Sequence, residues 1–159
     1  MRRMIQRIFV ATVCCLTIPV CSVAAGDLTF YEGNGCSQDI VFEYDSRKPS
    51  NDNCKKSGAC EGDNDEARSL KIKQGALAGT VITVYDSPEG DTTDDYTKIV
   101  IGKDNPGEIC IETFERSTVW RAATQAKTPR AARTTYTEKN GLDGKISRVH
   151  VAPPEDIDF

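Results

Sequence analysis

The residues best suited to catalysis in this sequence are one histidine and a large set of carboxylates. His150 is the single histidine and lies in an alternating apolar run. No nucleophile-elbow motif accompanies it, whereas a Ser-His-Asp or Cys-His centre needs an activated nucleophile beside the imidazole. Glycoside hydrolysis would need two facing carboxylates at a set separation. Asp94 with Asp95, or Glu108 with Glu112, are close in sequence, but no spacing among the 24 acidic residues selects a pair. We expect a solvent-facing histidine, a solvated acidic surface and no enzyme.

Residues 1–25 have the three parts of a secretory signal peptide. Three arginines precede an apolar run from Ile8 to Val20, and small residues follow at 23–25. The run is about 13 residues long, shorter than the roughly 20 of a membrane-spanning helix. We expect cleavage near Gly26 and a secreted or periplasmic protein. The alternatives are an uncleaved anchor and a lipid-anchored Cys21.

Removal of this leader makes the protein more acidic. It takes three of the 20 basic residues and none of the 24 acidic ones, which leaves 17 against 24 and a net charge of −7. Nucleic acid and anionic membranes are poor partners for such a chain. The remaining residues, about 134, suit one domain, which we expect to be a monomer.

Four cysteines remain after the leader: Cys36, Cys54, Cys60 and Cys110. An even number in an oxidising compartment predicts two disulfides and excludes a thiolate zinc site. Three pairings are open. The preferred one closes a small loop between Cys54 and Cys60 and bridges two sheets through Cys36 and Cys110.

Short alternating runs separated by turn residues dominate the rest of the chain, which predicts about eight strands in an antiparallel β-sandwich. The predicted strands are 28–31, 40–44, 69–73, 80–85, 97–101, 109–114 and 145–151. Polar residues 45–65 are expected to form an ordered loop. Alanines favour a helix in 115–135, but Pro129 and several threonines oppose it, so we expect a basic loop with a short helix. The acidic tail from 153 is expected to be flexible.

The chain also contains a weak internal repeat. Residues 28–32 match 82–86, since each run alternates and ends in an aromatic residue and a carboxylate. Residues 64–72 likewise match 143–151, where an acidic corner leads into a strand. Two similar halves follow from this pattern.

An aromatic-acid strand end followed by an acidic corner resembles the βγ-crystallin-like Greek key domains, whose domains consist of two Greek key motifs packed as a sandwich. The resemblance covers roughly residues 27–151. It implies a single domain over 26–152, with motifs at about 27–75 and 80–151.

Many microbial members of that family bind calcium through two Asn or Asp residues, two variable positions, Ser or Thr, and then Ser. By this resemblance the first corner would offer Asp65 and the backbone of Glu66. The second would offer Asp143, the backbone of Lys145, and Ser147. Calcium is a hard cation that takes six to eight oxygen ligands.

Both corners depart from the family pattern. Arg68 stands where the first corner needs a hydroxyl, and a cation there opposes calcium. Gly144 stands where the second corner needs an acid. Cys36 and Gln38 also replace residues that usually follow the aromatic strand end. The resemblance therefore implies weak calcium binding at most, with a structural or binding role for the domain.

The alternative is a secreted interaction protein, an inhibitor or host-directed factor, that acts through the loops predicted at 45–65 and 115–140. Trp120 and Arg121 lie in the second of these, where an aromatic side chain among cations could contact an acidic protein or a glycan. Packing of Trp120 over the edge of the core is the other interpretation.

Overall fold

The computed structural model describes residues 26–103, 107–121 and 130–156, and every regular element in them is a strand. The first half contains β1 (Leu28–Gly33), β2 (Ser37–Tyr44), β3 (Ser50–Asn53) and β4 (Ser69–Ile72). The second half contains β5 (Val81–Tyr85), β6 (Tyr96–Ile101), β7 (Ile109–Ile111), β8 (Thr118–Arg121), β9 (Arg130–Thr137) and β10 (Arg148–Ala152). No helix in this part is long and apolar enough to cross a membrane.

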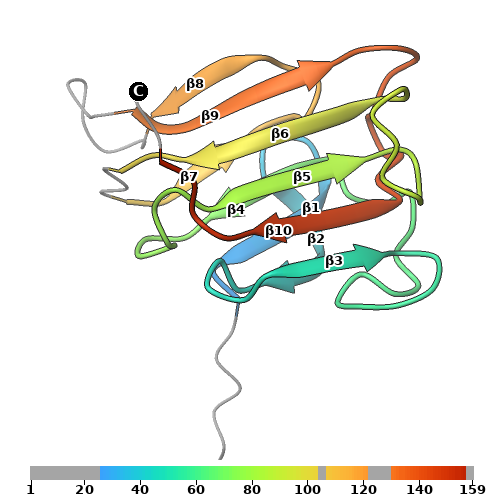
Figure 1. The fold of residues 1–159 in the computed structure, drawn as a ribbon, viewed down its shortest axis with the longest axis horizontal. Helices are drawn as coiled ribbons and strands as arrows, with labels where there is room; N and C mark the ends of the chain where they lie inside the picture. Colours follow the sequence, from blue (N-terminus) through green and yellow to red (C-terminus); the bar gives the residue numbers. More distant parts are fainter. Residues whose placement is uncertain (1–25, 104–106, 122–129, 157–159) are drawn as a thin grey trace, which may run out of the picture.

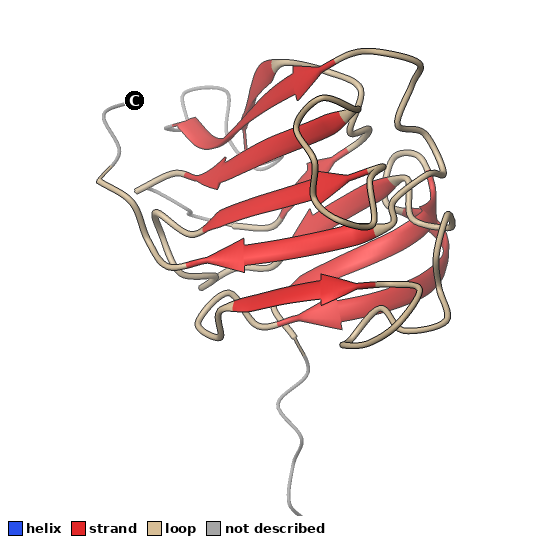
Figure 2. Ribbon diagram, turned by 45° about the vertical axis from the view of Figure 1, so that its right-hand side comes forward, coloured by secondary structure: helices blue, strands red, loops and turns tan. Residues whose placement is uncertain are grey.

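The strands form two antiparallel sheets that stack as a sandwich, one in front of the other in Figure 1 and seen from a second angle in Figure 2. One sheet has the order β2-β1-β4-β7 and the other β3-β10-β5-β6-β9-β8. Each half sends one strand to the other sheet, because β3 pairs with β10 and β7 pairs with β4. The two halves therefore share both sheets, and neither buries its apolar face alone.

Alternation along the strands places one apolar row of each sheet between the layers. Leu28 and Phe30 of β1 pair with Tyr44 and Phe42 of β2, and all four are buried. The Phe30 ring centroid lies 4.7 Å from that of Phe42 and 6.1 Å from that of Phe114. The facing sheet contributes fully buried aliphatic residues: Ile82, Val84, Ile99, Ile101, Val149 and Val151. Each such side chain contributes roughly 1.5–3 kcal/mol by leaving water.

Two segments differ from their sequence-based predictions. The predicted loop 45–65 contains β3, an edge strand of polar residues held by pairing with β10. The predicted loop and helix at 115–135 contain β8 and β9, which extend the larger sheet beyond β6. Threonines favour strands, and the small side chains of Ala131 and Ala132 are fully buried. The residues with the strongest helical preference, 122–129, lie outside the described part.

Both disulfides have the preferred pairing. Cys54 and Cys60 close a small loop after β3, and both are fully buried. Cys36 precedes β2 and joins Cys110 on β7. The Cys36–Cys110 bridge was expected to connect the two sheets. It does not, because β2 and β7 belong to the same sheet, as its two edge strands. It joins the two halves of the chain instead.

The acidic tail is attached to the larger sheet where it is described. The Glu155 backbone N–H donates to the Gly79 carbonyl at 3.0 Å, and its carboxylate accepts from Lys98 Nζ at 3.0 Å. Glu155 therefore contacts the larger sheet, while the flexibility of the tail stays a prediction. Residues 157–159, like the predicted leader, lie outside the described part.

Candidate metal-binding corner

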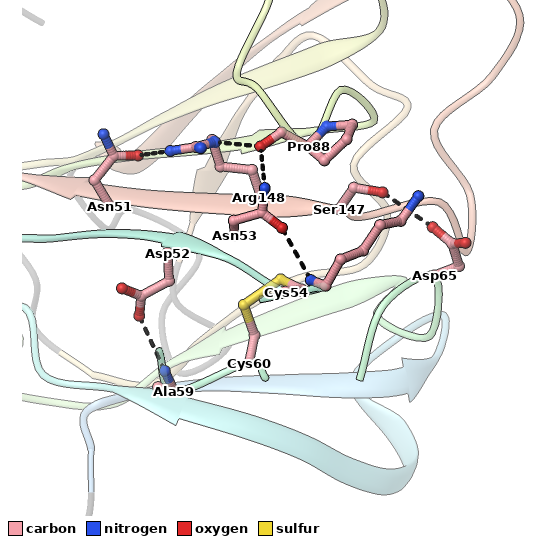
Figure 3. The surroundings of a disulfide bond; sticks show 11 residues. Asn51, Asp52, Asn53, Cys54, Ala59, Cys60, Asp65, Pro88, Ser147 and Arg148 are labelled. Carbon is pink, nitrogen blue, oxygen red and sulfur yellow. Dashed lines mark hydrogen bonds between the residues drawn. A yellow bond between two sulfur atoms is a disulfide. The ribbon is translucent and has the colours of Figure 1, made fainter. Parts of the chain in front are cut away.

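The two corner motifs of the repeat meet at one end of the sandwich. The Asp65 backbone N–H donates to the Ile146 carbonyl at 3.0 Å, and the Ser147 hydroxyl donates to Asp65 Oδ1 at 3.2 Å. Figure 3 shows the Asp65 and Ser147 side chains turned towards each other. Ser147 is also fixed to the sheet, since its N–H donates to the Tyr85 carbonyl at 2.8 Å. A carboxylate from one half thus faces a hydroxyl from the other.

A second contact between the two halves lies on the other side of the corner, where an arginine stands in place of the serine. Arg68 Nη1 donates to the carbonyls of Glu32 at 2.9 Å and Glu66 at 3.0 Å. Its Nε lies 3.6 Å from Asp143 Oδ1. We call these four residues the Arg68 wing. One guanidinium therefore occupies the space between two carbonyl oxygens and a carboxylate.

Gly144 makes room for that guanidinium. A Cβ at residue 144 would lie 2.5 Å from Arg68 Nη2, and the residue has a φ of +66° that favours glycine. Gly144 replaces the second acid of the family pattern, and Arg68 replaces the hydroxyl. The guanidinium of Arg68 thus fits only because residue 144 has no side chain.

The opposite side, the Asp65 wing, consists of Asp65, Ser147, the Ile146 carbonyl and the nearby Asp86. Asp86 directly follows β5, at the repeat position of Glu32. Burial first and then the charge of Asp94 raise the pKa of the Asp86 carboxyl, while the Lys145 ammonium lowers it. Asp65 adds to the rise. The negative charge of this wing is therefore only partly compensated, by the Lys145 ammonium.

Asp86, Asp94 and Asp95 bring carboxylate oxygens within 4.8 Å of one another. Asp95, which the sequence suggested to be solvated, is fully buried. Its carboxylate accepts from the Tyr136 hydroxyl at 2.9 Å and from three successive backbone N–H groups, those of residues 139–141. These donors outweigh the burial and lower the pKa of the Asp95 carboxyl. Asp95 thus fixes the chain between β9 and β10 and is satisfied by protein donors.

The two wings differ in their fit to calcium. The Arg68 wing does not fit, because the guanidinium already binds the carbonyl of Glu66 and the carboxylate of Asp143. The Asp65 wing provides a carboxylate, a hydroxyl and backbone carbonyls, which are the ligands calcium takes. Beside it, the Asn64 side-chain oxygen is buried and accepts no hydrogen bond in the described part of the chain. The predicted ligands are therefore divided between the wings. Asp65 and Ser147 contact each other, Glu66 and Asp143 contact Arg68, and no contact among the described residues assigns the Lys145 carbonyl to either wing.

Arg68 was interpreted from the sequence only as an obstacle to calcium binding. Its position in the repeat indicated that a cation stood at a ligand position. The sequence did not indicate that this cation would bind the ligand oxygens of the opposite corner. That contact depends on the packing of two segments from different halves.

The remaining candidate residues lie away from this corner. Trp120 is only 9% exposed, and its Nε1 donates to Thr134 Oγ1 at 3.0 Å, so it packs over the core edge. Its neighbour Arg121 is exposed. His150 is partly exposed and pairs across the sheet with Asn51 and Thr83.

The two carboxylates of the second acid pair, Glu108 and Glu112, have different ion partners. Glu108 lies 3.1 Å from Lys71 Nζ, and Glu112 lies 3.7 Å from Arg116 Nη1. Each carboxylate therefore pairs with a different cation.

The fold and the corner define the class of protein. It is a disulfide-bonded antiparallel β-sandwich in which each half of the chain contributes one strand to the sheet of the other half. No protein-family model matches the chain, and no curated protein or solved structure shows significant similarity to it.

Proposed function

We propose that this chain is an exported, non-catalytic βγ-crystallin-like domain with a structural or binding role, in which the Asp65 wing binds calcium weakly. The reciprocal contact of the two corners carries the proposal. Asp65 of the first corner meets Ser147 of the second, and Asp143 of the second meets Arg68 of the first. Each acid thus contacts the residue at the hydroxyl position of the opposite motif.

The strand order supports the family assignment. In a Greek key the fourth strand returns to lie beside the first. Here β4 pairs with β1, and β10, the last strand of the second half, pairs with β5. The inserted hairpin of β8 and β9 lies at the far edge of the larger sheet and leaves this relation unchanged.

Export is supported by the two disulfides, which persist in oxidising compartments. A compact sandwich closed by two bridges also suits a structural role outside the cell, where resistance to unfolding matters.

Calcium binding at the Asp65 wing would use the Asp65 carboxylate and the Ser147 hydroxyl, with the Lys145 carbonyl as the family resemblance implies. Three protein ligands are few for calcium, which takes six to eight oxygens, so water must supply others and the affinity is low. A bound cation would neutralise the repulsion around Asp86.

Calorimetric titration of the oxidised mature protein with calcium tests this proposal, and the two wings provide matched variants. Wild type should give a weak, saturable heat that Asp65→Asn and Ser147→Ala abolish. Asp143→Asn, which removes the carboxylate of the Arg68 wing, should leave the heat unchanged. A melting temperature unaffected by millimolar calcium and by chelator would remove calcium from the proposed function.

A second candidate function is capture of a protein partner through the β8–β9 hairpin. Val119 is 37% exposed on the edge strand β8, next to the exposed Arg121. Val119→Asp with Arg121→Glu should abolish capture if this edge is the contact, while calcium binding should remain. Capture that is unaffected by the double substitution contradicts this function.

A further inference from the structure

Two exposed apolar side chains lie on edge strands at opposite sides of the sandwich. Ile40 of β2 is 57% exposed and Val119 of β8 is 37% exposed, and no other large apolar side chain is exposed in the described part of the chain. β2 is an edge of the smaller sheet and β8 an edge of the larger one. In Figure 1, β8 lies at the top of the molecule and β2 towards the bottom. The two side chains therefore belong to separate surfaces.

A β-bulge turns Ile40 outward. The register of β1 and β2 shifts between Phe30, which pairs with Phe42, and Tyr31, which pairs with Ile40. Side chains two apart in a strand share a face, so alternation alone would place Ile40 on the inward face with the buried Phe42. Val41 is the extra residue that reverses the alternation. The exposure of Ile40 therefore follows from the register of the two strands.

The surroundings of Ile40 are acidic. Ile40 lines a cavity of about 290 Å³ together with five acidic residues: Glu32, Asp39, Asp63, Asp65 and Glu66. None of these five carboxylates takes part in an ion pair among the described residues. Arg68 also lines the cavity, but its guanidinium pairs with Asp143. We call Ile40 and the five acids the β2 edge.

The surroundings of Val119 are basic. Val119 pairs with Arg133 across β8 and β9, and Arg121 lies two residues further along β8. Both arginines are exposed, as is Arg116, which lies two residues before β8. We call Val119 and these three arginines the β8 edge. An aliphatic side chain among cations therefore stands at one side of the molecule, and an aliphatic side chain among acids at the other.

The two edges can pair with each other but not with themselves. Among the described strands, β2 pairs only with β1 and β8 only with β9. The outer backbone N–H and C=O groups of such edge strands can pair with another chain. Two β2 edges, or two β8 edges, would bring like charges together. The net charge of −7 after residue 25 also makes two copies repel at long range, so association requires that opposite edges face each other.

We propose that copies of this chain associate head to tail, with the β8 edge of one copy against the β2 edge of the next. Val119 then contacts Ile40, and the arginines lie beside the acids. A contact between two different surfaces is heterologous, and its repetition at opposite sides of the molecule gives open chains. β8 has only four residues, so the contact is small and the chain is a monomer when dilute. The proposal goes beyond the structural or binding role above and does not depend on calcium.

Sedimentation equilibrium of the oxidised mature protein in chelator tests this proposal by exchanging charge between copies. The weight-average mass of the wild type should rise with concentration past that of a dimer. Asp39→Lys alone and Arg121→Glu alone should each weaken association at least about tenfold, because like charges then face each other. An equimolar mixture of the two variants should restore association, since the reversed β8 edge of one variant then meets the reversed β2 edge of the other.

Matched controls make the same changes of charge away from both edges. Glu89→Lys, in the turn after β5, and Lys139→Glu, after β9, are at exposed positions and should associate as the wild type does. Ile40→Ser should weaken association without lowering the melting temperature, because the Ile40 side chain is exposed. This variant separates loss of the contact from loss of the fold.

A wild type that stays monomeric at high concentration would overturn the proposal, and so would a mixture of the two variants that stays dissociated. A dimer that Arg121→Glu loses and Asp39→Lys keeps would also overturn it, because a contact between two β8 edges does not involve β2. Capture of a different protein through β8 would likewise be independent of Asp39. Association is measured in chelator, so its failure is distinguishable from failure of the proposed calcium binding.

Discussion

Nε of Arg68 lies 3.6 Å from Oδ1 of Asp143, and this contact joins the corner of the first half to the corner of the second. The same guanidinium holds the carbonyls of Glu32 and Glu66. Arginine thus supplies a permanent positive charge among oxygens that would otherwise repel one another. The Arg68 wing is joined by this guanidinium, whereas the Asp65 wing is joined by the hydrogen bond from the Ser147 hydroxyl to Asp65 Oδ1.

Replacement of Arg68 with serine should lower stability in chelator by about 1 kcal/mol, because two carbonyls lose a charged donor at a partly exposed position. The serine supplies the missing hydroxyl, so calcium should restore the loss and the calorimetric stoichiometry should rise. Lys98→Ser, which removes a surface ion pair, should show no restoration by calcium. An unchanged stoichiometry in Arg68→Ser would contradict the assignment of this wing.

Asp86→Asn should raise the melting temperature by a few degrees in chelator at pH 7. The folded state raises the Asp86 pKa, so protonation favours folding. The stabilising contribution is fully present below the unfolded pKa of about 3.9 and is lost as pH rises through the folded value. The advantage of the variant should therefore disappear below about pH 4. Asp39→Asn, an exposed control, should show little effect, and a gain that persists at low pH would argue against this origin.

The two disulfides should contribute unequally to stability. The Cys36–Cys110 bridge spans a sequence separation of 74 and the Cys54–Cys60 bridge one of 6. On loop-closure entropy, removal of the first should cost about 4 kcal/mol and removal of the second about 2 kcal/mol. Urea unfolding of the two paired Cys→Ala variants measures both costs. Equal costs would indicate that the lost core packing of Cys54 and Cys60 outweighs the entropy.

Trp120→Ala should destabilise the protein by about 3–5 kcal/mol, because the side chain is buried and satisfies Thr134. The adjacent Val119→Ala, on the outward face of β8, should cost less than about 0.5 kcal/mol. Chemical denaturation of both variants checks the contrast. Similar small losses in both would show that β8 contributes little to the core.

Local pattern was sufficient for most strands. The runs that became β1, β5, β6 and β10 alternate in the sequence, and side chains of a strand alternate between two faces. Segments without that pattern were misread. β3 contains only polar residues, and the adjacent Ala131 and Ala132 of β9 are both buried although neighbouring side chains point to opposite faces, so neither strand shows an apolar period.

The residues of the candidate site could be predicted from the sequence, but the residues that they contact could not. Asp65, Asp143 and Ser147 were identified from the repeat. Asp65 faces Ser147, and Asp143 faces Arg68. Both contacts depend on β3 and β7, which each join the sheet of the other half and bring the two halves together.

The sequence by itself determined the strand-rich class, the four cysteines after residue 25 and the two related halves, because these follow from composition and from periods of a few residues. Only the tertiary structure decided which strands exchange sheets, that the long-range disulfide joins the β1–β2 turn to β7 within one sheet, and which oxygens contact Arg68. Those features depend on contacts between residues far apart in the chain, whose free energy is set by packing that no local period encodes.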